Sequence, residues 1–143
     1  MTAKPLKVGA TYDDLVRVPE HFVAEMFDGE LYASPRPAFA HARAASVLGV
    51  ELGGPFDRGR NGPGGWLILD EPELHFGNDV LVPDLAGWRR ERLPSTPKEP
   101  YLARAPDALY ERSLAQIAEH HGEASVRALP FDAIELELRA LWS

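Results

Sequence analysis

The sequence predicts a single α+β domain, and three features of the chain carry that prediction. Asp28 and Gly29 stand between two short runs of mixed apolar and polar residues, and this pair is typical of a two-residue hairpin turn. The Ala-rich segment 40–52 favours a helix by propensity. Residues 66–70 and 74–88 are apolar runs typical of strands covered on both faces, with a junction at Gly77, Asn78 and Asp79. A chain of 143 residues is long enough for one domain with its own core.

The predicted elements have recognisable boundaries. Thr11 precedes a short helix that Pro19 ends, because threonine is a good N-cap and proline interrupts helices. The hairpin spans residues 23–34. The helix of residues 40–52 ends at the pair of glycines that begins with Gly53.

Composition narrows the class of protein. The formal net charge of -7 argues against a protein that coats nucleic acid through overall charge. A local basic strip could still form, although a solvated charged face also explains the arginines, which are Arg58, Arg60, Arg89, Arg90 and Arg92. With no cysteine, only oxygen ligands and five histidines could bind a metal. No long apolar run and no signal core are present, so we expect a cytoplasmic protein without membrane contact.

Asp84 is an acid inside an apolar run, directly after Pro83. Proline donates no ladder hydrogen bond, so we expect the strand to end near Asp84. A carboxylate in an apolar setting is costly unless it is paired, hydrogen-bonded or bound to a metal. At a strand end beside a cleft, a metal ion is one of these options.

Four segments of the chain carry a resemblance to a known family. They are EMFDGELYASPRPAFAHARAA, WLILDEPELHFGNDVLVPDLAGWRRERLP, APD and PFDAIELEL. Together they resemble the Uma-two-type restriction endonucleases, bacterial proteins of the PD-(D/E)xK nuclease superfamily. The resemblance covers nearly the whole chain, and its most specific part is the block around Pro83 and Asp84.

The resemblance implies a restriction-endonuclease-like mixed sheet flanked by helices, with Asp84 as the acid of the PD half of the motif. In such nucleases this Asp and a Glu from the next strand bind a divalent ion, usually Mg²⁺, while a lysine polarises the attacking water. Hard cations prefer carboxylate oxygens, and attack on a phosphodiester of DNA needs positive charge near the developing negative charge. The expected cofactor is therefore Mg²⁺ and the expected partner is DNA.

The second half of the motif departs from the resemblance. After APD, at residues 105–107, the family continues with a strand bearing Glu, a helix carrying the lysine and a further core strand. Here the chain has an apparent internal deletion near 107–122, so a core strand and a helix are missing. Its lysines are Lys4, Lys7 and Lys98, and none follows residue 98 to serve as the catalytic lysine. Arginine would do this work poorly, because its guanidinium stays protonated.

Two acids could complete the site. Glu111 stands four positions after Asp107, the offset at which the family's metal-binding Glu follows APD. The helical spacing of apolar residues over 110–121 supports the alternative, a surface helix in which Glu111 is an ordinary solvated acid. Glu73 could instead approach Asp84 across the hairpin and supply the second carboxylate.

Other side chains could contact substrate. His41 matches a position where relatives often carry a histidine, so it could lie near the scissile phosphate or simply bond the start of the helix. Arg89 and Arg90 could contact DNA. Glu30 could bind a metal through water, although a solvent-facing strand acid explains it equally.

Two functional hypotheses follow. The first is a metal-dependent endonuclease in which Asp84 acts with Glu111 or Glu73. The second is a non-catalytic remnant that interacts with DNA or protein, and the missing lysine favours it for this chain. The lost strand would expose a sheet edge, which either residues 130–142, with their helical spacing, or a second copy in a homodimer would cover.

Overall fold

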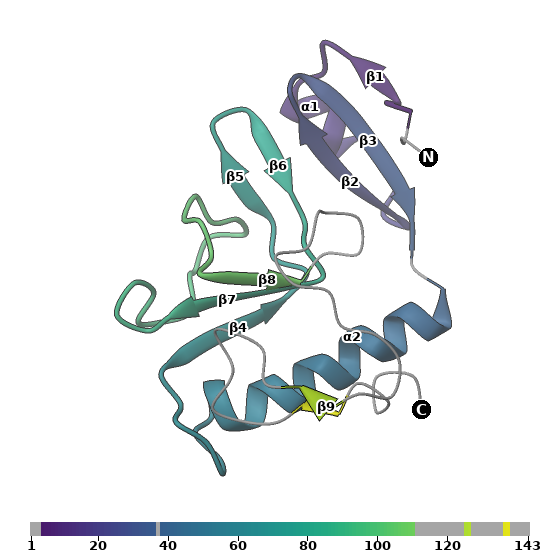
Figure 1. Ribbon diagram of the computed structural model, residues 1–143. Coiled ribbons are helices and arrows are strands. Elements are labelled where there is room, and N and C mark those ends of the chain that lie inside the picture. The colour runs from purple at the N-terminus through teal and green to yellow at the C-terminus, as the bar shows by residue number, and fades with distance from the viewer. Residues whose placement is uncertain (1–3, 37, 111–124, 127–135, 138–143) are drawn as a thin grey trace.

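The computed structural model describes residues 4–36, 38–110, 125–126 and 136–137. It is an α+β structure with antiparallel sheets and one main helix. Figure 1 shows a five-stranded sheet at the top, a three-stranded sheet below it, and helix α2 beneath the three-stranded sheet. We call the two larger sheets sheet A and sheet B. The predicted α+β class is confirmed.

Sheet A is built from two hairpins and a short edge strand. Its order is β1-β3-β2-β6-β5, and its strands are β1 (Lys7–Val8), β2 (Phe22–Phe27), β3 (Glu30–Pro35), β5 (Leu74–Phe76) and β6 (Asp79–Leu81). Asp28 and Gly29 join β2 to β3 with φ values of 51° and 75°. Both values lie in the left-handed region that a type I′ turn requires. The predicted hairpin is therefore confirmed.

Helix α1 begins where its capping residue predicts, whereas α2 continues past its predicted end. Thr11 caps α1 (Tyr12–Val16) in a capping box with Asp14. Helix α2 (Phe39–Leu52) fits the predicted helix but does not stop at Gly53, because a π-helical turn, η1 (Gly53–Asp57), continues it. The ring of Phe56 is only 1% exposed and packs in one cluster with residues of α2 and of the following strand. Burial of this ring outweighs the tendency of the glycines to end the helix.

Sheet B has the order β4-β7-β8, formed by β4 (Trp66–Asp70), β7 (Leu85–Arg89) and β8 (Ala108–Tyr110). The segment 74–88 divides near the predicted junction at Gly77, Asn78 and Asp79 and again at Pro83: its residues form β5, β6 and β7, with Pro83 between β6 and β7. Every pair of named strands is antiparallel, and the parallel component is an isolated bridge between Leu74 and Leu102. The described strands therefore form antiparallel sheets in place of the expected mixed sheet.

The carboxyl-terminal expectations are tested at few residues. Ser125–Val126 (β9) pairs antiparallel with Leu136–Glu137 (β10). The helix expected over 130–142 is therefore wrong at the two residues described there. The helix expected over 110–121 lies outside the described residues, apart from Tyr110, which ends β8.

A long loop between β7 and β8 ties the two larger sheets together. Leu102 donates its N–H to the Glu73 carbonyl and accepts from the His75 N–H, at 3.0 Å each, beside sheet A. Trp88 of sheet B donates its indole N–H to the Arg104 carbonyl at 3.0 Å. The loop therefore bonds to both sheets within three residues.

Trp88 forms the centre of the largest buried cluster. It is 0% exposed and packs with Leu67, Leu74, Ala86 and Leu93. No helix in the described part of the chain is both long and apolar enough to cross a membrane.

Replacing Trp88 with alanine should cost about 3–5 kcal/mol of the free energy of unfolding, because it leaves a cavity and an unpaired carbonyl. Urea denaturation measures this change. Phe39→Ala is the matched control, since this ring is 95% exposed, and it should stay within about 0.5 kcal/mol of the parent. Equal midpoints for the two variants would contradict the placement of Trp88 in the core.

Candidate functional site

Asp84 lies at the junction of the two sheets. Strand β6 ends at Leu81 and β7 begins at Leu85, so the Pro83-Asp84 pair occupies the connection, as the sequence predicts. The Asp84 carbonyl accepts the Glu71 N–H at 3.1 Å, one position beyond the Asp70–Leu85 pair of the β4–β7 ladder. The backbone is therefore fixed at this point, and the side chain points toward α2.

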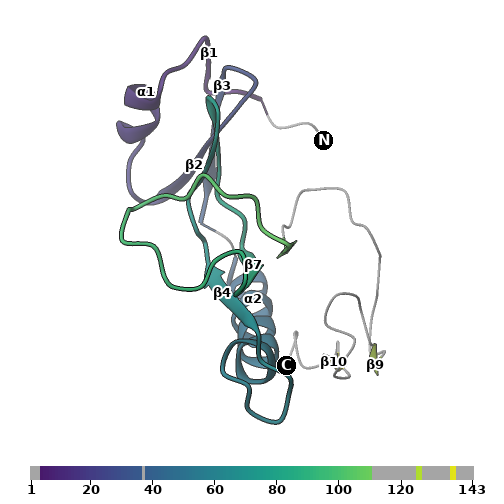
Figure 2. The ribbon, with the colours of Figure 1, turned by 90° about the vertical axis from the view of Figure 1, so that its left-hand side faces the viewer.

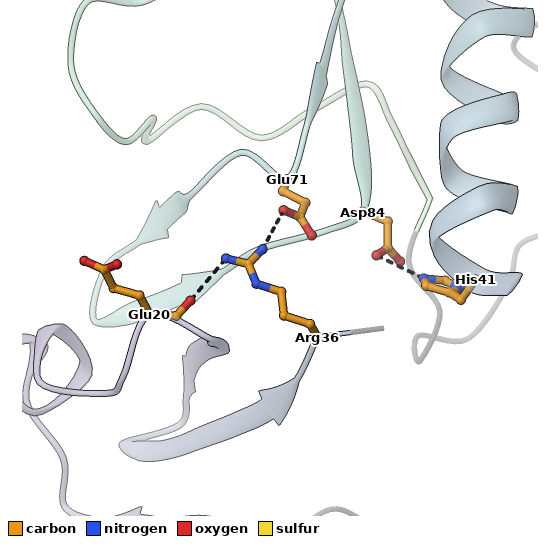
Figure 3. A network of polar contacts seen from close by, with 5 residues as sticks. All are labelled: Glu20, Arg36, His41, Glu71 and Asp84. Carbon is orange, nitrogen blue, oxygen red and sulfur yellow. Dashed lines mark hydrogen bonds and ion pairs between the residues drawn. The ribbon is translucent and has the colours of Figure 1, made fainter. Parts of the chain in front are cut away.

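His41 and Asp84 come together. His41 lies in the first turn of α2, and its Nε2 is 3.2 Å from Asp84 Oδ1 (Figure 3). The two side chains are only 13% and 17% exposed. The structure thus brings together two of the residues that the sequence analysis selected, from segments 43 residues apart.

Glu25 is a member of the site that the sequence analysis missed. It lies on β2, and its Oε1 accepts the Val82 N–H at 2.9 Å, two residues before Asp84. Burial raises the pKa of Glu25; the bond from Val82 opposes this shift and the negative charge of Asp84 adds to it. The charge of Asp84, in the β6–β7 connection, therefore acts on a carboxylate of β2. Because this depends on the pairing of β2 with β6, the local sequence carries no signal for it.

An arginine approaches the same junction from β3. Arg36 follows the end of β3, and its guanidinium lies 3.5 Å from Glu71 Oε2 while donating to the Glu20 carbonyl at 3.1 Å. Figure 3 shows this guanidinium beside Glu71, with Asp84 and His41 on the far side of Glu71. The Arg36 side chain is 58% exposed. A positive charge, paired with Glu71, thus lies at the edge of the junction.

Oxygen ligands suit a hard divalent cation such as Mg²⁺, and Asp84 and Glu25 supply them from neighbouring segments. Within the described residues, however, no group of three His, Asp or Glu side chains is placed to bind a metal ion. Glu111 lies outside the described residues. The described part of the chain therefore provides two acidic side chains near the junction and not a complete set of metal ligands.

Glu73 and Glu30 have other partners. Glu73 Oε1 accepts from the Tyr12 hydroxyl at 2.8 Å and lies 2.7 Å from His75 Nε2. Glu30 accepts from the Tyr32 hydroxyl. The structure does not bring Glu73 to Asp84; its carboxylate lies with Tyr12 and His75 instead.

Arg89 and Arg90 have structural contacts. The Arg89 guanidinium lies over the Trp66 ring, 4.8 Å from its centroid. Arg90 pairs with Asp57 at 2.9 Å and so ties η1 to the end of β7. Each arginine already has a partner, which limits the basic strip that composition suggested.

A comparison with solved structures identifies the fold. No family model matches the sequence, and a search of curated proteins finds no match either. A crystal structure from Anabaena variabilis, described as a "putative nuclease belonging to DUF820", matches with a TM-score of 0.60 and 16% sequence identity. The match covers 93% of this chain and 97% of that one. DUF820 is the Uma-two-type, restriction-endonuclease-like family, so the match confirms the resemblance in its fold.

The raised pKa of Glu25 has a consequence for stability. The ordinary pKa of a glutamate carboxyl is 4.5, and the raised value means that the folded state favours the neutral form of Glu25. The stabilisation that this preference gives to the folded state is present below pH 4.5 and is lost as the pH rises through the folded pKa. Glu25→Gln keeps an oxygen to accept the Val82 N–H and stays neutral. It should therefore be more stable than the parent at pH 7, and the gain should shrink toward pH 4. Urea denaturation at both pH values measures it.

Glu20→Gln is the matched control, because the Glu20 carboxylate is exposed and only its backbone carbonyl binds Arg36. It should change little at either pH. A Glu25→Gln variant with the same gain at pH 7 and pH 4 would show that charge is not the cause.

Proposed function

We propose that the chain is a restriction-endonuclease-like domain in which Asp84 and Glu25 bind Mg²⁺ beside a DNA phosphodiester, with impaired hydrolysis. The observation that carries the proposal is the convergence of Asp84, Glu25 and His41 where β6 passes into β7. The shared fold with the DUF820 structure supports the same class of protein.

The two carboxylates favour a cation for a physical reason. The negative charge of Asp84 disfavours the ionised form of Glu25, and a divalent cation bound by both would compensate the two negative charges. We take Glu25 as the second ligand in place of Glu73, which binds Tyr12 and His75. Glu111 remains the proposed third ligand. When bound, the ion would supply positive charge to a phosphate oxygen and to the attacking water.

Two further side chains would position a metal ligand and the substrate. His41 holds the Asp84 carboxylate through its Nε2, and this contact fixes the direction of one metal ligand. Arg36 carries a guanidinium suited to grip a phosphate in a bidentate way. Both residues act on position and charge, and neither replaces a lysine that polarises water.

The missing lysine is why we propose impaired hydrolysis. Lys7 pairs with Asp14 at 2.7 Å on sheet A's edge, and Lys98 lies in an exposed loop. We attribute the loss to the apparent deletion near 107–122, which removes the family's strand with Glu and helix with Lys. A cytoplasmic location and a homodimer that covers the β8 edge belong to the same proposal.

A second candidate is a non-catalytic module that binds DNA or protein. It is favoured by the lack of a three-ligand group within the described residues. The two candidates differ in one respect, which is whether the Asp84 site turns over a phosphodiester.

Mg²⁺ should raise the melting temperature of the parent chain. Binding to the folded state alone stabilises by about 2.7 kcal/mol when the ion is 100-fold above its Kd. Asp84→Ala should abolish this shift and Glu25→Gln should reduce it. Asp13→Ala, which removes an exposed carboxylate from α1, should keep the full shift. A parent chain that no divalent ion stabilises would refute the metal site.

A nicking assay on supercoiled DNA with Mg²⁺ or Mn²⁺ tests the chemistry. We expect slow nicking by the parent and by Asp13→Ala, and none by Asp84→Ala. Nicking that survives in Asp84→Ala would overturn the role of Asp84. Metal binding without any nicking would support the non-catalytic module instead.

A further inference from the structure

A half-open pocket of about 550 Å³ lies on sheet A, away from the Asp84 site. Tyr12, His75 and Tyr101 contribute its aromatic lining, Met26 and Val80 its buried apolar lining, and Asn78 an exposed amide. Pockets of this size accept small organic ligands. None of the proposed nuclease residues lines it.

The three rings come from three separate segments. The His75 ring, on β5, stacks on Tyr101 of the long loop with centroids 4.0 Å apart and planes 12° apart. Tyr12 of α1 meets the edge of His75 at 5.1 Å. Figure 2 shows α1 and the loop after β7 on the same side of sheet A. The fold therefore assembles one aromatic wall from distant parts of the chain.

Polar bonds hold this wall in place. Glu73 accepts from the Tyr12 hydroxyl and pairs with His75, and the bond to Glu73 raises the pKa of Tyr12, so that the phenol stays a donor. Leu102, the residue after Tyr101, bonds to the backbone of Glu73 and of His75. The rings are positioned before any ligand arrives, which lowers the entropic cost of binding.

The wall has an open part. Tyr101 is 44% exposed although one face of its ring covers His75, and Tyr12 is 42% exposed. A partly exposed ring that lines the pocket can stack with a further flat ring, and each base stacked on an aromatic side chain gains about 1–3 kcal/mol. The exposed Asn78 amide offers both donors and an acceptor to the edge of such a ring.

The charges around the pocket favour an uncharged ligand over an anionic one. No Lys or Arg is among the residues that line the pocket in the described chain, and the Glu73 carboxylate lies behind the rings. A phosphate would be repelled here, whereas an uncharged base would not. The pocket is therefore suited to the base of a nucleoside and not to the phosphate of a nucleotide.

The pocket and the Asp84 site use opposite faces of sheet A. Met26 pairs with Val80, and Val80 with His75, so these three side chains share one face. Glu25 precedes Met26 and points to the other face, where it binds the backbone beside Asp84. Occupation of one site leaves the other accessible.

We propose that this pocket binds a flat, uncharged heteroaromatic ring, the base of a nucleoside, by stacking it on Tyr101. The proposal goes beyond the nuclease activity and does not depend on it. The ring could come from a free nucleoside or from an unpaired base in a nucleic-acid strand.

NMR titration of the full chain with adenosine, thymidine and ribose tests the proposal. The two nucleosides should shift the amide signals of Gly77 and Asn78 and the ring signals of His75, and ribose should not. Tyr101→Ala should weaken nucleoside binding about 5- to 100-fold. Tyr101→Phe should bind within about twofold of the parent, because the ring and not the hydroxyl makes the stack.

Phe39→Ala serves as the matched control, since it removes an exposed ring far from the pocket, and it should bind like the parent. The amide spectrum of each variant reports whether it is folded. A single-stranded oligoadenylate that shifts the same signals at lower concentration than adenosine identifies the strand as the source; preference for adenosine identifies the free nucleoside.

Three results would overturn the proposal. Nucleosides that leave the pocket signals unshifted would show that the rings only pack against one another. Binding that a folded Tyr101→Ala variant retains would place the ligand elsewhere. Shifts caused by tetramethylammonium but not by nucleosides would make the pocket a cation site.

Discussion

The missing amide hydrogen of Pro83 constrains the whole structure. A strand that continued through this residue would need a donor there, so β6 ends at Leu81 and the chain passes from sheet A to sheet B before β7 begins. This change of sheet releases Asp84 from the alternation of either ladder. It also places the Asp84 side chain beside the first turn of α2, where the carboxylate contacts His41. One backbone constraint thus separates the sheets and creates the carboxylate site between them.

Three boundaries of the fold could be predicted from local sequence alone. The Asp28-Gly29 turn, the Thr11 cap and the strand end at Pro83 each follow from the conformational preference of one or two residues. The boundary at Gly53 could not be predicted in this way, because the burial of Phe56 overrides the glycine signal. That burial depends on Trp66, which lies on another element.

The candidate site also contains residues that could be predicted from the sequence and residues that could not. Asp84 could be selected from sequence because an acid in an apolar run after proline is unusual, and His41 because the resemblance marked it. Glu25 could not, since its approach to Asp84 requires β2 to pair with β6. Glu73 shows the reverse case: its position along the hairpin suggested proximity to Asp84, but its partners are Tyr12 and His75. Nonlocal register decides both outcomes.

The long loop after β7 has a mechanical consequence. Leu102 bonds to β5 in sheet A, while the Arg104 carbonyl bonds to Trp88 in sheet B. The loop therefore bridges the two sheets by hydrogen bonds, in addition to the covalent connections of the backbone. A cut between Leu102 and Arg104 would break this bridge and leave the relative position of the sheets to those connections and to side-chain packing. The support of the Asp84 junction thus extends to a loop that contributes none of the side chains proposed for the site.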